Sequence, residues 1–184
     1  MTSHSVTDTP PRSLAVIRLV QGLTAAGALF LLVLPPLFWA RADWVMQLGP
    51  AMAGIGTHPV HVGGAARAWG AAVSLPLVGL GLFALWQLWR LFAEYAHGRA
   101  LGQPALRHLR RFAWSVLATA LLQPLAKAAL SVALTVGNPP GQRLLSLSLG
   151  SSDYLALLLG AVLLAVAQVM HQAVLAAEEN RGFV

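Results

Sequence analysis

Long apolar runs, separated by short polar or basic segments, dominate the chain. Four of these runs have the ~20 residues that a helix needs to cross the ~30 Å hydrocarbon core of a bilayer. The pattern therefore predicts four transmembrane helices, at about residues 14–39, 69–89, 112–136 and 154–174. Residues 1–13 are polar and include two adjacent prolines, which predicts a disordered tail.

The composition indicates a membrane protein. Hydrophobic residues make up 57% of the 184 residues, charged residues make up only 10%, and the mean hydropathy is +0.68. Soluble domains have ~25% charged residues, so a soluble fold would lack charges for its surface. We therefore expect one all-α domain over residues 1–184, an integral membrane four-helix transmembrane bundle. The chain has no cysteine, which excludes disulfides and thiolate metal sites.

The net charge of +6 comes from arginines at the ends of the apolar runs. Such a distribution is typical of membrane topology and not of direct nucleic-acid binding. The turn over residues 90–111 holds five of the twelve Lys and Arg residues, and Arg12 and Arg18 lie near the N-terminus. The positive-inside rule therefore predicts that this turn and both termini are cytoplasmic.

The third apolar run carries the only lysine of the chain, Lys127. Polar residues recur every four positions around it, and the row comprises Ser115, Thr119, Gln123, Lys127, Ser131 and Thr135. In hydrocarbon each of these groups needs a partner inside the protein. A spacing of four follows the ridge along which a neighbouring helix crosses. We expect Thr119, Gln123, Lys127 and Ser131 to bind a ligand or a partner helix.

None of the six acidic residues falls inside a predicted span, so Lys127 has no obvious carboxylate partner in its own chain. Pro124 cannot donate to the carbonyl of Ala120. We therefore expect Lys127 to lie among that carbonyl, Gln123 and Thr119. Three interpretations stay open: an interfacial or packing lysine, a site for an acidic or polar ligand, and a contact with an acidic residue of a partner protein.

A second polar cluster lies near the end of the fourth span. Gln168, His171 and Gln172 share one helix face, and a histidine there can shuttle protons or bind a metal. Such histidines are more often interfacial, and we keep Gln168 and His171 as candidate ligand-binding or partner-binding residues. His58 and His61 have a spacing that can bind a metal, but two imidazoles alone are too few ligands, so we expect no metal site.

Three arginines precede the third span. Arg107, Arg110 and Arg111 suit the headgroups of anionic lipids. Alternatively, they can pair with Glu178 and Glu179, two acids placed unfavourably at a helix C-terminus unless a cation is near.

Residues 145–149 alternate between leucine and serine after a turn signal at residues 137–141. A period of two predicts a half-buried strand. We expect this strand to pair with residues 60–62.

Short motifs at the basic turn and the C-terminus resemble a known family. They are the aromatic and small-residue turn over residues 91–101, the Leu-Arg-Arg before an aromatic at residues 109–114, and the acidic tail over residues 178–184. They resemble a bacterial family of four-span membrane proteins catalogued as a domain of unknown function, DUF2975. Leu101 stands where that family typically has phenylalanine. The resemblance implies a multi-pass protein of the bacterial cytoplasmic (inner) membrane and, at most, a small helix-turn-helix regulator as cytoplasmic partner. It implies no activity.

Catalytic motifs are missing: the chain has no nucleophile elbow, no HExxH, no phosphate-binding GxxxxGK and no pair of acids in a span. We expect a non-enzymatic sensor, regulatory or immunity-type protein without a cofactor, which binds a small ligand or partner helix through the polar row. The alternative is a small transporter or channel subunit in which the row lines a path for a polar or anionic solute. A third interpretation is an intramembrane enzyme or haem-binding subunit. Expected partners are the lipid bilayer and a cytoplasmic regulator or another membrane protein, and homo-oligomer formation stays open.

Overall fold

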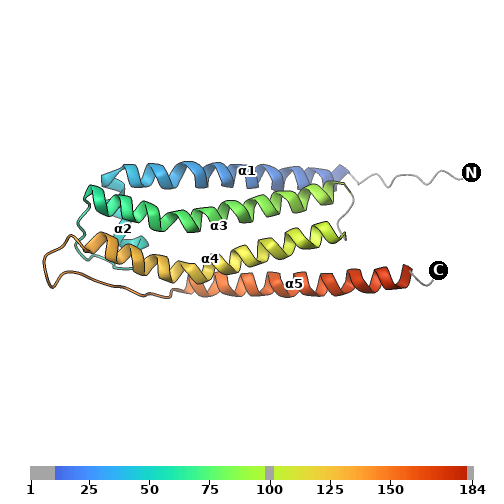
Figure 1. Ribbon diagram of the computed structural model, residues 1–184. Coiled ribbons are helices and arrows are strands. Elements are labelled where there is room, and N and C mark those ends of the chain that lie inside the picture. Colours follow the sequence, from blue (N-terminus) through green and yellow to red (C-terminus); the bar gives the residue numbers. More distant parts are fainter. Residues whose placement is uncertain (1–10, 98–101, 182–184) are drawn as a thin grey trace, which may run out of the picture.

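The computed structural model describes residues 11–97 and 102–181, with side chains described over residues 15–97 and 102–175. Within those residues the chain forms five helices: α1 (Pro11–Ala40), α2 (Ala42–Met52), α3 (Gly64–Ala96), α4 (Gln103–Thr135) and α5 (Ser151–Arg181). Helices α1, α3, α4 and α5 are long and apolar enough to cross a membrane (Figure 1). The four predicted spans are confirmed as helices of that kind, each starting earlier than predicted.

The start of α1 corrects one boundary. The helix begins at Pro11, inside the segment predicted as a tail, and residues 1–10 lie outside the described residues. A proline suits the first turn of a helix because its missing N–H would have no partner there.

The long helices form an open row. Helix α1 packs on α3, α3 packs on α4, and α4 packs on α5. Helices α1 and α5 lie at opposite edges and do not pack extensively on each other, so in the described part of the chain the predicted bundle is not closed (Figure 1). The row has a terminal end, where α1 begins and α5 ends, and an α2 end, where α2 contacts both α1 and α4.

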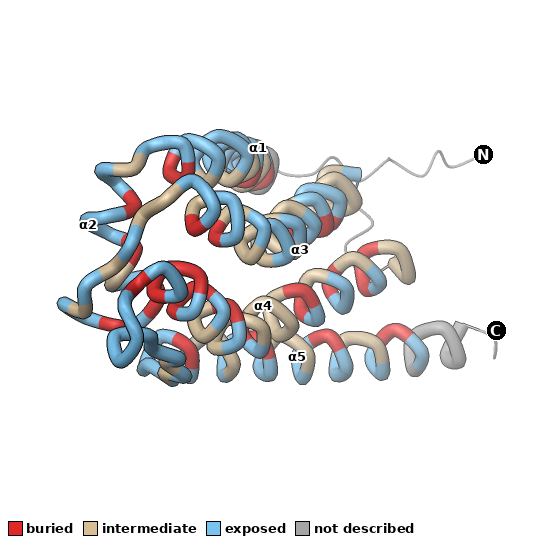
Figure 2. The backbone as a smooth tube through the Cα atoms, turned by 60° about the vertical axis from the view of Figure 1, so that its left-hand side comes forward, coloured by how far each residue is buried: buried red, intermediate tan, exposed pale blue. Residues whose placement is uncertain are grey.

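Helix α4 is the centre of the row. In its most apolar stretch 33% of the residues are buried, compared with 11% in each of the other three long helices (Figure 2).

Small residues bring the helices close together. A Cβ added at Gly160 of α5 would lie 3.0 Å from the Cα of Leu117 on α4, and Gly70 of α3 lies against the ring of Trp39.

The connection from α4 to α5 contains the predicted turn but not the predicted strand. The amide of Gln142 donates to the carbonyl of Pro139 at 3.1 Å, and Gly141 has a φ of +92°. Residues 143–150 then run in an irregular, non-helical conformation alongside the last turns of α4, and the described residues contain no strand. The predicted pairing of residues 145–149 with residues 60–62 is therefore wrong. We call residues 143–150 the return segment.

The leucine–serine alternation has another role. Leu145, Leu147 and Leu149 are 67–74% exposed, whereas Ser146 and Ser148 are half-buried. In a membrane protein an exposed apolar side chain can face lipid, so the leucines point outward and the serines point toward the protein.

Candidate functional site

The two members of the polar row nearest the C-terminus of α4, Ser131 and Thr135, bind the return segment. The amide of Leu144 donates to the hydroxyl of Thr135 at 3.1 Å, and the amide of Ser146 donates to the hydroxyl of Ser131 at 2.9 Å. Each hydroxyl donates its own proton within α4, Thr135 to the carbonyl of Ser131 and Ser131 to the carbonyl of Ala128. The free lone pairs of the two oxygens are therefore available to the two amides.

The spacing of these two contacts follows from chain geometry. Four residues of α-helix advance ~6.0 Å, and two residues of extended chain advance ~6.6 Å. Steps of four along α4 therefore keep register with steps of two along the return segment. Non-helical backbone beside a membrane helix needs such partners, because hydrocarbon offers none. Ser131 and Thr135 are fully buried and serve this structural role.

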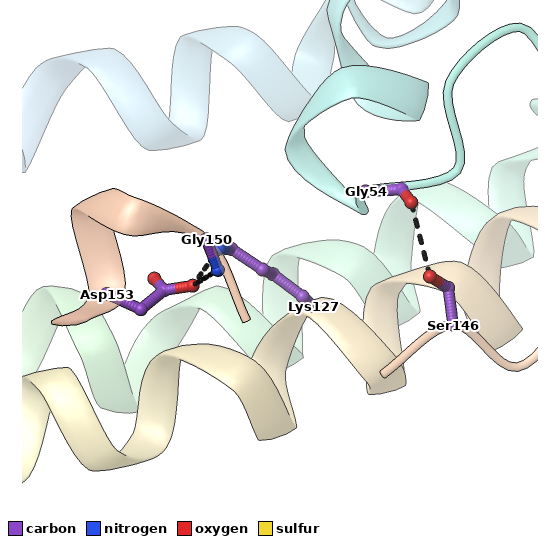
Figure 3. A network of polar contacts seen from close by, with 5 residues as sticks. All are labelled: Gly54, Lys127, Ser146, Gly150 and Asp153. Atoms are coloured by element: carbon purple, nitrogen blue, oxygen red, sulfur yellow. Dashed lines mark hydrogen bonds and ion pairs between the residues drawn. The ribbon is translucent and has the colours of Figure 1, made fainter. Parts of the chain in front are cut away.

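Lys127 contacts a carboxylate of its own chain. Its Nζ lies 2.6 Å from Oδ2 of Asp153, and the side chains are 18% and 4% exposed (Figure 3). The expectation that Lys127 has no carboxylate partner is therefore wrong. It does not bind the carbonyl of Ala120, Gln123 or Thr119, since Asp153 is its hydrogen-bond partner among the described residues.

Asp153 reaches Lys127 because α5 begins part-way along α4. Oδ2 of Asp153 also accepts the amide of Gly150 at 2.8 Å, and the carbonyl of Gly150 accepts the amides of Asp153 and Tyr154. Gly150 thus precedes the first helical residue, and Asp153 at the third position reaches back to it, as in half of a capping box.

The members of the polar row nearer the N-terminus of α4, Ser115, Thr119 and Gln123, have a different environment. The hydroxyls of Ser115 and Thr119 donate to the carbonyls four residues before them, at 2.8 Å each. Among the described residues, the side-chain amide of Gln123 has no hydrogen-bond partner, and it is half-buried. Gln123 is therefore the member of the row whose donors and acceptor are available to a bound molecule.

Gln123 lies between two cavities. The large cavity, about 620 Å³, is lined by residues of all five helices and is open on one side. The small cavity, about 360 Å³, lies between α3, α4 and α5. Gln123 and Ser152 line both cavities, Lys127 lines the large one, and Asp153 and Thr119 line the small one. The Lys127–Asp153 ion pair therefore stands between the two spaces.

The large cavity is mainly apolar. Among the described residues that line it, the polar ones are Ser74, Gln123, Lys127 and Ser152. The hydroxyl of Ser74 already donates to the carbonyl of Gly70 and accepts from the indole of Trp39. The available polar groups are thus gathered on the α4 and α5 side, opposite an apolar wall formed by α1. A volume of 300–1,000 Å³ is typical of sites for small organic molecules.

The second predicted cluster and the arginines come together in a third space. A niche of about 180 Å³ between α4 and α5 is lined by Arg107, Arg110, Gln168 and His171, together with Gln103, Leu106 and Ala167. We call it the arginine niche. Arg111 does not line it. The alternative pairing of these arginines with Glu178 and Glu179 involves side chains outside the described residues.

Comparison with known proteins identifies the family of the chain. The family model described as "Protein of unknown function (DUF2975)" matches residues 59–181. The chain belongs to the DUF2975 family. The matched region contains α3, α4, α5 and the whole polar row, whereas α1 and α2, which complete the large cavity, precede it. No curated protein and no solved structure matches the chain.

One buried polar contact of this DUF2975 protein was missed by sequence reasoning. Nδ1 of His108 lies 2.7 Å from Oε1 of Gln87, which joins α4 to α3. An amide oxygen only accepts, so this histidine nitrogen carries the proton. Gln87 is fully buried, and its Nε2 has no hydrogen-bond partner among the described residues. The sequence signal for this contact was Gln87 itself, a lone glutamine in an apolar run.

The two loop histidines of the DUF2975 chain connect their loop to the end of α4 and to the loop that follows it. Nε2 of His58 lies 3.0 Å from the carbonyl of Gln142, to which it donates, and the backbone amide of His61 donates to the carbonyl of Leu134. The side chain of Asn138 adds a bond to the carbonyl of Pro59 at 2.7 Å. These contacts give the histidines a structural role.

Proposed function

We propose that this DUF2975 protein is a non-enzymatic sensor or regulatory membrane protein, in a class that includes immunity-type proteins, and that it binds a small ligand in the large cavity. The observation that carries the proposal is the half-buried amide of Gln123, which has no partner among the described residues and lines a cavity of about 620 Å³. A half-buried amide gains stability when a ligand supplies a hydrogen bond that the protein does not.

The lining favours an amphipathic ligand with a neutral polar head. Asp153 balances the charge of Lys127, so the ion pair does not attract a second anion strongly. The ammonium group has three N–H donors, and Asp153 accepts one of them. A hydroxyl or carbonyl of the ligand, placed beside Gln123, completes this arrangement while its apolar part lies against Phe30, Leu34 and Phe38 of α1.

A route for signalling follows from the same contacts. Lys127 joins α4 to the start of α5, and both helices continue to the terminal end of the row. A ligand that shifts the ion pair shifts α5 relative to α4. In our proposal the terminal end faces the cytoplasm of a bacterium, where a small helix-turn-helix regulator or another membrane protein reads the change.

A second function, a transporter or channel subunit for a polar or anionic solute, is supported by one observation. Gln123 and Ser152 line both the large and the small cavity, so the two spaces adjoin around the ion pair. Two features favour the sensor. Ser131 and Thr135 are buried beneath the return segment, so the polar row does not extend an open path to the α2 end, and Asp153 removes the net positive charge that an anion path needs.

Native mass spectrometry of the protein extracted from its own membranes tests the sensor proposal. We expect a retained small molecule of a few hundred daltons. Ala126 lines the cavity, whereas Ala129 is exposed and does not. Ala126→Leu fills part of the cavity and is expected to abolish retention, while Ala129→Leu, the matched control, retains the molecule. Retention that is equal in both variants contradicts the site.

Liposome flux distinguishes the second function. Purified protein in liposomes is expected to conduct no polar or anionic solute above the level of empty liposomes. Flux that disappears in Gln123→Leu but persists in Ala129→Leu would replace the sensor with a transporter.

A further inference from the structure

The arginine niche lies away from the cavity of the proposed function, at the terminal end of the α4–α5 pair. It is formed by the first two turns of α4 and by the part of α5 around residues 167–171. Each helix contributes a pair of polar side chains three residues apart, Arg107 with Arg110 on α4 and Gln168 with His171 on α5. Residues three apart lie on the same face of a helix, so these four side chains, together with Gln103 at the start of α4, bring hydrogen-bonding groups to one space of about 180 Å³.

The chemistry of the lining selects an anion with several acceptor oxygens. None of the lining residues among the described side chains is acidic. Among the described residues, no group accepts a hydrogen bond from the guanidinium of Arg107 or Arg110, so these side-chain donors are available. Guanidinium groups bind phosphate oxygens in a two-pronged geometry, and the amide of Gln168 adds a further donor. The first turn of α4, which begins at Gln103, adds the partial positive charge of a helix N-terminus.

The surroundings favour a phosphate that belongs to a lipid. Trp114 follows Arg110 by one helical turn and is exposed, as expected of a tryptophan at a membrane interface. Val166 and Val169 are exposed beside the niche on α5 and offer an apolar surface to acyl chains. A headgroup can therefore enter the niche while its chains follow the helices.

We propose that the arginine niche binds the phosphate group of an anionic phospholipid, held by Arg107 and Arg110 from α4 and by Gln168 and His171 from α5. Arg111 is adjacent in sequence and equally charged, but it does not line the niche. Of the three arginines assigned to lipid headgroups from the sequence, two thus form a specific site and the third supplies only general charge.

Native mass spectrometry of the full-length protein in detergent tests the proposal. We would titrate phosphatidylglycerol and phosphatidylcholine with identical acyl chains and then add glycerol phosphate as a soluble competitor. We expect phosphatidylglycerol to bind about tenfold more tightly than phosphatidylcholine, which corresponds to ~1.4 kcal/mol. Displacement by glycerol phosphate at concentrations similar to those of the lipid would support the phosphate site but identify a soluble phosphate ester as its occupant.

Variants locate the site. Arg107→Gln/Arg110→Gln is expected to reduce phosphatidylglycerol affinity about tenfold, while Arg111→Gln changes it less than about twofold. Gln168→Leu leaves every charge in place and is also expected to weaken binding, whereas Gln172→Leu, outside the niche, is not. Equal losses for all three arginines, or equal binding of the two lipids, would overturn the proposal. The thermal unfolding midpoint of each variant shows whether the fold is retained.

Discussion

The hydroxyl oxygen of Ser131 on α4 accepts the backbone amide of Ser146 at 2.9 Å. The two residues are fifteen positions apart, and their contact fixes a non-helical segment against the central helix of the row. Four residues further along α4, the hydroxyl of Thr135 accepts the backbone amide of Leu144 in the same way. Ser131, which sequence reasoning assigned to a ligand or partner, and Thr135 of the same polar row therefore bind a part of their own chain.

Removing either hydroxyl is expected to destabilise the protein. Ser131→Ala leaves the amide of Ser146 without an acceptor, and Thr135→Val does the same to Leu144. We expect each change to lower the free energy of unfolding by about 1–3 kcal/mol, the usual cost of an unsatisfied buried donor. Denaturant unfolding in detergent micelles measures the loss, and hydrogen exchange of the amides at residues 144 and 146 is expected to accelerate.

Ser115→Ala is the matched control for that experiment. Its hydroxyl donates only to the carbonyl of Arg111 in its own helix, so its removal leaves no backbone amide without an acceptor. A loss at Ser115 as large as that at Ser131 would show that the return segment contributes little.

The ion pair predicts that the effects on stability of replacing Lys127 and of replacing Asp153 depend on each other. Lys127→Met leaves the carboxylate of Asp153 with the amide of Gly150 as its only partner among the described residues, and Asp153→Asn leaves a half-buried ammonium without a counter-charge. Each single change is expected to lower the thermal unfolding midpoint by roughly 5 °C or more. The double variant Lys127→Met/Asp153→Asn contains no charge at the site and is expected to lose less than the sum. Strictly additive losses would contradict a direct ion pair.

The helices were predictable because twenty-residue apolar runs have few alternatives in a membrane protein. The partner of Lys127 was not, because Asp153 lies just before the predicted fourth span and nothing in composition reports how far along α4 the next helix begins. The available signal was local: Gly150 is a residue type accepted at an N-cap, and Asp153 three residues later is an acid of the kind that the first turn of a helix favours. It places a carboxylate at the first turn of α5.

The alternation of leucine and serine misled for a physical reason. In a soluble protein the apolar face of an alternating segment is buried, which predicts a half-buried strand. Here Leu145, Leu147 and Leu149 are exposed and Ser146 faces the protein, where its hydroxyl donates to the carbonyl of Gly54 at 3.2 Å (Figure 3). Lipid accepts apolar side chains, so in a membrane protein the same alternation is compatible with leucines that face outward and serines that face the protein.

The close approach of α4 and α5 at Gly160 predicts strong sensitivity to side-chain size. A Cβ at that position would lie 3.0 Å from the Cα of Leu117, and backbone cannot move aside as a flexible side chain can. Gly160→Leu is therefore expected to lower the free energy of unfolding by about 1–3 kcal/mol and to disturb the arginine niche further along the same pair of helices. Gly79→Leu on α3 is the control, because a Cβ at Gly79 meets nothing within 4 Å.

The distribution of arginines predicts the orientation of the row in the membrane. The chain contains no cysteine, so single cysteines can be introduced without a background. Gln142 and His97 are both exposed and lie at opposite ends of the row. If the positive-inside rule holds, a membrane-impermeant maleimide labels Gln142→Cys in intact cells, and labels His97→Cys only after permeabilisation. Labelling in the reverse order would place both chain ends outside, and labelling of both variants in intact cells would contradict a row of helices that spans the bilayer.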